Sequence, residues 1–196
     1  MGKTLENPSK IPTTGRIGRW ARIIEEETSQ DTAEKVLQGA DQFKSLNNTE
    51  KAAWIRGAVE KLEKLIGQEK TRKIMESCGR KCCGPTSRKK AKQLMDESDS
   101  LEEFIRKLNE KGLGGGRLTL HGDTITGGYD HCYCGQVKQT KEPFLTLTYC
   151  SCSAGWYKQL FESALGKPVE VELLQSIICG ADTCEFTICI GGEKNE

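Results

Sequence analysis

Apolar residues recur at helical spacing through most of the first half of the chain. The clearest stripe follows the capping candidates Asn48 and Thr49 and comprises Ile55, Ala58, Val59, Leu62, Leu65 and Ile66. Charged residues occupy positions between them, as in a helix that has one face toward a core and the other toward solvent. We therefore predict that residues 16–112 are helical and that residues 1–15 form a flexible arm.

The last helix of that region has its own start signal. Ser100 and Glu103 can form a capping box ahead of the apolar residues Phe104, Ile105 and Leu108. We expect this helix to begin at Ser100 and to end near Gly112.

After the three glycines at 114–116 the pattern changes to the alternation of β-strands. It covers residues 117–121, 124–128, 129–137 and 144–150, and later 169–178 and 184–190. One amphipathic helix interrupts the strands, with Ala154, Tyr157, Leu160, Phe161 and Leu165 on its apolar face, and Gly166 closes it. The predicted fold is α+β, with a helical N-terminal half packed on a C-terminal antiparallel sheet; residues 113–196 form a cysteine-rich domain that binds a ligand or a metal.

Charge and composition narrow the classes of function. The chain has 29 Lys and Arg against 28 Asp and Glu, so its balance does not indicate a nucleic-acid or membrane partner. No apolar run approaches the length of about 20 residues that spans a bilayer, and the first residues lack the apolar core of a signal peptide. We therefore expect a cytoplasmic protein. In that reducing compartment, ten cysteines predict metal ligands or redox thiols rather than disulfides.

Two Cys-x-Cys pairs lie in the segments 129–137 and 144–152. In a strand, residues i and i+2 project to the same face. If the two segments formed a hairpin, Cys134 would oppose Cys150 and Cys132 would oppose Cys152. Four sulfurs would then lie on one face, close enough to surround a tetrahedral ion. The alternative is that small buried cysteines simply pack in two strands.

A third group of thiols lies at the end of a helix and is flanked by basic residues. Cys78 and Cys82 are one helical turn apart, and Cys83 is followed by Gly84 and Pro85, which stop the helix. Nearby positive charge favours thiolates, so these three cysteines are candidates for reactive chemistry or metal ligation. An ordinary basic helix end is the alternative.

Two further residues, Cys189 and His131, are less favoured as ligands. Cys189 alternates away from Cys184 in its strand, which predicts a structural role. His131 is adjacent to Cys132 but would point away from the sulfur face of the predicted hairpin.

Residues 149–186 resemble the 4-vinyl reductase domain family, which includes the sensor domains of bacterial regulators that respond to aromatic compounds. The residues at matching intervals are Cys150, Gly155, Gly166, Pro168, Gly180 and Cys184. The resemblance implies an α+β ligand-binding fold with a small-molecule cavity and a structural zinc, with Cys150 and Cys184 at the positions of two zinc ligands. Leu173 and Ser176 stand where the sensors have a ligating glutamate and cysteine, so Cys152 and Cys179 are the natural replacements.

Our leading hypothesis is a zinc-thiolate protein with a ligand-binding fold and a sensor or accessory role. The first-choice metal ligands are Cys150, Cys152, Cys179 and Cys184, while Cys132 and Cys134 compete with or share the site. An iron–sulfur cluster is compatible with the same thiolates. The alternative function is a thiol- or iron–sulfur-based redox enzyme, provided that Cys78, Cys82 and Cys83 meet the C-terminal cysteines in space.

The resemblance also implies a cavity over the sheet. A small hydrophobic or aromatic molecule is the ligand that such a cavity would take, and the candidate lining residues are Trp156, Tyr133 and Tyr149. The same aromatic residues are also suited to an ordinary core. The sequence is also compatible with a homodimer.

Overall fold

The computed structural model describes residues 11–191, and the arm predicted at 1–15 falls mostly outside them. The first half is helical: α1 (Gly15–Glu27), α2 (Gln30–Val36), the 3-10 turn η1 (Ala40–Gln42), α3 (Asn48–Ile66), α4 (Gln68–Cys82), α5 (Pro85–Asp96) and α6 (Leu101–Glu110). The second half contains β1 (Thr119–His121), β2 (Thr124–Tyr129), η2 (Thr148–Cys150), α7 (Ser151–Leu165), β3 (Glu170–Gln175), η3 (Ile177–Cys179) and β4 (Cys184–Cys189). The α+β prediction is confirmed. None of the helices between residues 11 and 191 is long and apolar enough to cross a membrane.

Local capping signals begin two of the helices. The Asn47 side chain accepts from the Glu50 amide, and the Glu50 carboxylate accepts from the Asn47 amide, so α3 starts with a full capping box one residue before the predicted cap. The predicted cap of α6 is confirmed, because the Ser100 hydroxyl accepts from the Glu103 amide at 3.2 Å. Leu65 was placed in the core stripe of α3 and is 51% exposed, so that part of the stripe was wrong.

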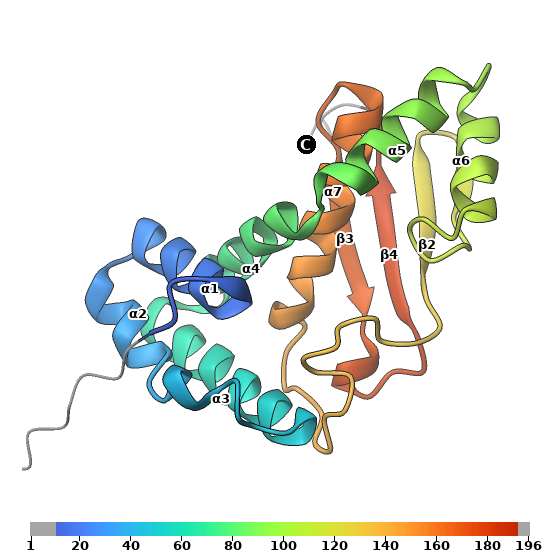
Figure 1. Ribbon diagram of the computed structural model, residues 1–196. Helices are drawn as coiled ribbons and strands as arrows, with labels where there is room; N and C mark the ends of the chain where they lie inside the picture. The colour runs from blue at the N-terminus through green and yellow to red at the C-terminus, as the bar shows by residue number, and fades with distance from the viewer. Residues whose placement is uncertain (1–10, 192–196) are drawn as a thin grey trace, which may run out of the picture.

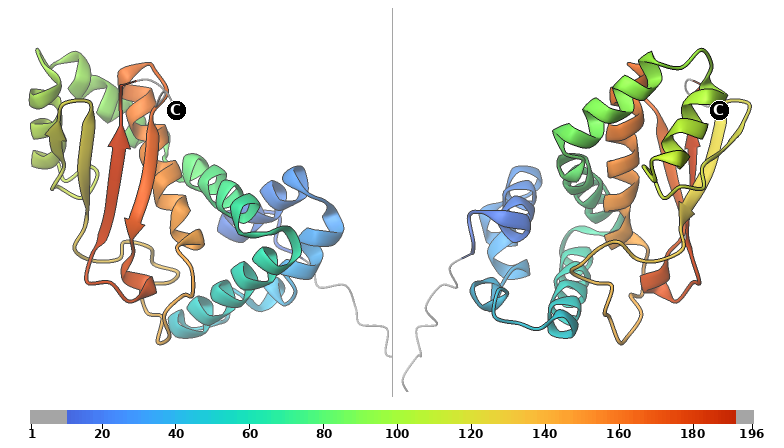
Figure 2. Two further views of the ribbon diagram at one scale, coloured as in Figure 1. Left: turned by 180° about the vertical axis from the view of Figure 1, so that it is seen from behind. Right: turned by 45° about the vertical axis from the view of Figure 1, so that its right-hand side comes forward.

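The sheet is antiparallel with the strand order β1-β2-β4-β3. Cys184 lies opposite Tyr129 on β2, and Cys189 at the other end of β4 lies opposite Thr124. Along β4, Cys184 is buried and Cys189 is half-buried, as their predicted opposite orientations require. Helix α7 runs along one face of this sheet (Figures 1 and 2) and packs its Tyr157 ring on Phe186, with ring centres 4.8 Å apart.

The predicted hairpin between residues 129–137 and 144–152 is wrong. β2 ends at Tyr129, residues 130–147 form an irregular loop, and Cys150 ends a 3-10 turn that leads into α7. Cys152 therefore lies on a helix and cannot oppose Cys132 across a sheet. The alternation that suggested strands arose because the loop buries Val137 and Phe144 against the helices while its polar residues face outward.

Two hydrophobic cores meet where α4 crosses α7. One core joins α1–α4 to the 137–150 loop, and the other joins α5–α7 to the sheet. Figure 1 shows α4 running obliquely beside α7, between the N-terminal helices and the sheet. A Cβ on Gly79 would lie 1.8 Å from the carbonyl oxygen of Cys152, and one on Gly155 would lie 1.9 Å from that of Glu76. The two backbones are thus in direct contact, which only glycine permits at these positions.

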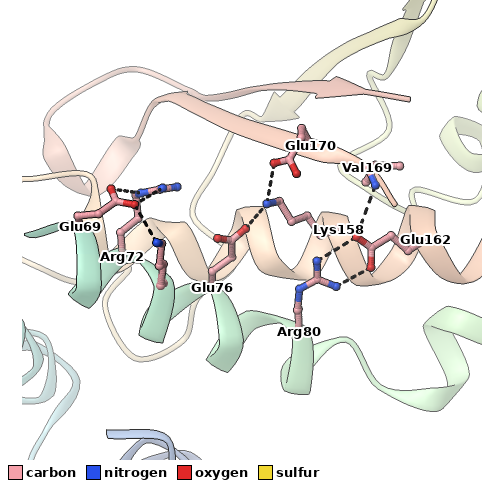
Figure 3. A network of polar contacts seen from close by, with 9 residues as sticks. Glu69, Arg72, Glu76, Arg80, Lys158, Glu162, Val169 and Glu170 are labelled. Carbon is pink, nitrogen blue, oxygen red and sulfur yellow. Dashed lines mark hydrogen bonds and ion pairs between the residues drawn. The ribbon is translucent and has the colours of Figure 1, made fainter. Parts of the chain in front are cut away.

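Ion pairs along one side of the crossing hold the helices in register (Figure 3). Arg80 donates two hydrogen bonds to Glu162, at 2.6 and 2.9 Å, and Lys158 pairs with both Glu76 and Glu170. Burial opposes the charge of Glu162, but the hydrogen bonds from Arg80 outweigh burial and lower the pKa of this carboxyl. Both of these hydrogen bonds can form at only one placement of α4 along α7, so the bidentate pair fixes the relative position of the two helices.

Alanine at the crossing should destabilise the protein. We expect Gly79→Ala and Gly155→Ala each to lower the free energy of unfolding by about 1–3 kcal/mol or more, because the added methyl group must push backbone apart. Gly57→Ala in α3 is the matched control, since a Cβ there meets nothing within 4 Å and should stabilise by about 0.5–1 kcal/mol. Urea unfolding measures all three. Equal effects at the three positions would contradict the close contact.

The Arg80–Glu162 pair predicts a pH-dependent contribution to stability. Because the pKa of Glu162 is lower in the folded protein, its stabilisation is present above the unfolded glutamate pKa and is lost as the pH falls through the folded value. Glu162→Gln should therefore be less stable than wild type at pH 7, and this difference should shrink below about pH 4. Thermal unfolding of both proteins across that range tests it; a difference that persists undiminished at low pH would refute it.

Candidate functional site

A cavity of about 440 Å³ lies at the junction of the two cores. Its walls come from α1, α3, α4, the glycine loop at 112–115, the loop after β2, the start of α7 and the start of β4. Seven of the ten cysteines line it: Cys78, Cys82, Cys132, Cys134, Cys150, Cys152 and Cys184. All ten cysteines are free thiols. The sequence predicted a metal site among the C-terminal cysteines and a separate group at the basic helix end. The helix crossing brings cysteines of both to one cavity.

Two arginines of α1 face sulfur atoms at one end of the cavity. Arg16 donates to the Sγ of Cys134 at 3.0 Å, and Arg19 donates to the Sγ of Cys82 at 2.8 Å. The Tyr149 hydroxyl is also 3.3 Å from the Cys134 sulfur. Burial opposes the charge of Arg16, but the facing Cys134, Tyr149 and Cys82 groups outweigh burial and raise its pKa, so it stays a cation.

The thiols of Cys78 and Cys152 complete that end of the cavity. Burial raises the pKa of Cys78 to about 12, with a further rise from the charge of Cys82. Burial also raises the pKa of Cys152, and the charges of Cys134, Cys82 and Cys78 add to the effect; all four residues line the cavity. We call Cys78, Cys82, Cys134 and Cys152 the arginine-facing thiols.

A second set of thiols lies around Ser176, which is 1% exposed. The Ser176 Oγ is 3.0 Å from the Sγ of Cys150 and 3.8 Å from that of Cys184. Cys179 lies in the 3-10 turn that follows Ser176, and burial raises the pKa of its thiol. We call Cys150, Cys179 and Cys184 the serine-facing thiols.

The remaining predicted site residues are placed differently. Cys132 lines the cavity, and burial raises the pKa of its thiol, with a further rise from the charges of Cys134 and Cys184. Cys83 is 2% exposed and belongs to the other core, on the opposite side of α4 from Cys78, so it does not reach the cavity. The predicted aromatic residues Trp156, Tyr133 and Tyr149 all line the cavity.

The serine-facing thiols are of the ligand type that zinc prefers. The ligand positions implied by the resemblance, Cys150 and Cys184, lie on either side of one buried hydroxyl, and Ser176 occupies the position of a third. Cys179 supplies another sulfur, whereas Cys152 belongs to the arginine-facing thiols. Between residues 11 and 191, no three His, Cys, Asp or Glu side chains are close enough to hold an ion as they stand. The donor set fits a soft metal, and side-chain rotation is needed to close it.

Sequence reasoning missed the two arginines and the position of Ser176. Arg16 and Arg19 are three residues apart and so share one face of α1, but nothing in that spacing indicates which distant thiols they meet. Ser176 was noted as a departure from the sensor pattern. The structure shows that its hydroxyl is a hydrogen-bonding centre for buried thiols.

Fold and cavity together define an α+β protein with a cysteine-lined chamber between its helical half and its sheet. The chain belongs to the family of unknown function DUF6144, whose sequence profile matches residues 20–194. No curated protein matches the chain. The resemblance to the 4-vinyl reductase domain therefore stays a prediction.

The thiols of the basic helix end should differ sharply in reactivity. Cys82 is exposed and receives a hydrogen bond from Arg19, whereas burial raises the pKa of Cys78 to about 12 and of Cys83 to about 11. In metal-free protein at neutral pH, brief alkylation should label Cys82 at least about tenfold faster than Cys83. Mass mapping gives the order, and the same reaction in denaturant, where all three should react alike, is the control. Faster labelling of Cys83 would contradict this arrangement.

Proposed function

We propose that this protein is a cytoplasmic metal-thiolate protein that holds zinc at the serine-facing thiols and binds a small molecule in the adjoining cavity, in a sensor or accessory role. The observation that carries the proposal is the convergence of Cys150 and Cys184 on one buried hydroxyl, with Cys179 in the 3-10 turn that follows this serine. Cys150 of η2 reaches Ser176 from 26 positions away in the chain, whereas Cys179 of η3 and Cys184 of β4 follow this serine closely in sequence. Thiolates of this kind are ligands that zinc prefers.

The local backbone supports a metal at this place. The Ile177 amide donates to the Cys184 sulfur at 3.4 Å, as an amide does toward a metal-bound thiolate. The Cys179 thiol donates to the carbonyl of Thr146 at 3.2 Å, and the Thr146 hydroxyl donates to Glu63 of α3. A metal here would therefore tie the sheet, the loop and the N-terminal helices together.

The cavity supports binding of a small molecule. Its volume of about 440 Å³ is in the range of pockets that hold drug-sized ligands. Tyr133, Tyr149 and Trp156 supply aromatic walls, and Tyr133 is 60% exposed, so it lies where a ligand would enter. A flat hydrophobic or aromatic molecule would stack on such walls. The metal would keep the walls in place rather than touch substrate, because its ligands are buried protein groups.

A second candidate function is redox chemistry at thiols or at an iron–sulfur centre. One observation favours it: α4 brings Cys78 and Cys82 to the same cavity as Cys134 and Cys152. This meeting was the condition that the sequence left open for Cys78 and Cys82. Cys83 does not meet it, because it faces the other core.

Loss of zinc ligands should lower metal content and stability together. Cys150→Ser and Cys184→Ser should release zinc, and they should lose the stabilisation that wild type gains from the metal, about 2.7 kcal/mol when free zinc is about 100 times its Kd. Elemental analysis and urea unfolding with and without zinc measure the two effects. Cys189→Ser on the opposite face of β4 is the matched control and should keep both. Wild-type protein with less than about a tenth of an equivalent of metal per chain after gentle anaerobic purification would count against the proposal.

A further inference from the structure

The arginine-facing thiols have features that a zinc site at Ser176 does not use. They come from three segments, α4, the loop after β2 and the first turn of α7, and they share none of the three serine-facing cysteines. We propose that the cavity holds an iron–sulfur cluster, bound by the thiolates of Cys78, Cys82, Cys134 and Cys152. This inference gives the second candidate function its site, and it does not depend on zinc at Ser176.

The helix crossing sets the spacing of three of the four ligands. Gly79 contacts the backbone of Cys152 directly, so Cys78 on the preceding position and Cys82 one turn later flank the start of α7. Cys134 reaches the same place from the loop, where the Tyr149 hydroxyl lies beside its sulfur. Four thiols from three segments of the chain supply the donor type of a cluster, although no three of them, between residues 11 and 191, lie close enough to hold a single ion as they stand.

The arginines supply the charge that such a cluster needs. Four thiolates around iron and sulfide leave a net negative charge, which is costly to bury unless cations compensate it. Arg16 and Arg19 each direct a guanidinium N–H at a ligand sulfur, at 3.0 and 2.8 Å. Among residues 11–191, neither guanidinium has a carboxylate within ion-pair distance, and sulfur is the acceptor that each of them faces. Hydrogen bonds to sulfur and nearby positive charge are also the groups by which proteins tune a cluster's potential.

The cavity as a whole has room for a polynuclear centre. Its volume of 440 Å³ is about fifteen times the volume that one water molecule occupies in liquid water. A single ion with four sulfur ligands would draw the walls together, whereas a cluster of several iron and sulfide ions keeps them apart. On binding, each thiol transfers its proton to solvent as its sulfur bonds to iron, so loading releases four protons if all four thiols start protonated.

Anaerobic reconstitution of the full chain with ferrous iron and sulfide tests the proposal. We expect broad visible absorption and about four iron and four acid-labile sulfide ions per chain. Cys82→Ser, Cys134→Ser and Cys152→Ser should each lower the retained cluster by about tenfold, while Cys189→Ser keeps it. Retained cluster at wild-type level in all three ligand variants would overturn the proposal, as would iron bound without sulfide.

Two further readouts separate a ligand role from loss of fold and from the zinc site. Arg19→Gln should retain the cluster but shift its reduction potential to more negative values, because a positive charge and a donor to sulfur are lost. An unchanged potential would contradict the role of the arginine. Cys179→Ser should lose zinc and keep the cluster, whereas Cys82→Ser should do the reverse. Loss of both metals in each variant would show one shared site and would overturn the assignment of two.

Discussion

The backbone contact between α4 and α7 determines how the rest of the molecule is arranged. Gly79 and Gly155 remove the side chains that would separate the two helices, and the Arg80–Glu162 pair fixes how far one slides along the other. One core then forms on each side of the crossing, with Cys78 in one and Cys83 in the other. The cavity lies between the two cores, and the contact between α4 and α7 determines its position.

Electrostatics divides the cysteines of the cavity into two groups. At one end the guanidinium groups of Arg16 and Arg19 donate hydrogen bonds to the sulfurs of Cys134 and Cys82, so positive charge lies beside these two residues. Beside the cavity, behind Cys150 and Cys184 of its wall, Ser176 offers a neutral hydroxyl to these two thiols in a fully buried setting. Neutral surroundings suit a closed site whose metal carries its own positive charge, whereas cations beside sulfur suit a centre with an excess of negative charge. The two proposals thus use different physical features of one chamber.

The aromatic residues connect this chamber to the sheet. Tyr157 stacks on Tyr129 with ring centres 5.7 Å apart and donates to the carbonyl of Gly114 at 2.9 Å, which holds the glycine loop against the cavity. Gly115 has a positive φ of 93°, and a Cβ there would lie 2.1 Å from the oxygen of Gly128. The loop read from the sequence as a turn is therefore also a wall of the chamber, packed directly on β2.

The sequence by itself determined the fold class and the elements whose signals are local. The Ser100 cap of α6, the amphipathic stripe of α7 with Gly166 after it, and the opposite orientations of Cys184 and Cys189 all depend on near neighbours in the chain. The segment 129–152 was misread because alternating burial in an irregular loop has the same period as a strand. Only the tertiary structure decided which thiols meet, because the encounter of Arg16 with Cys134 and of Cys78 with Cys152 depends on two glycines that let distant helices touch.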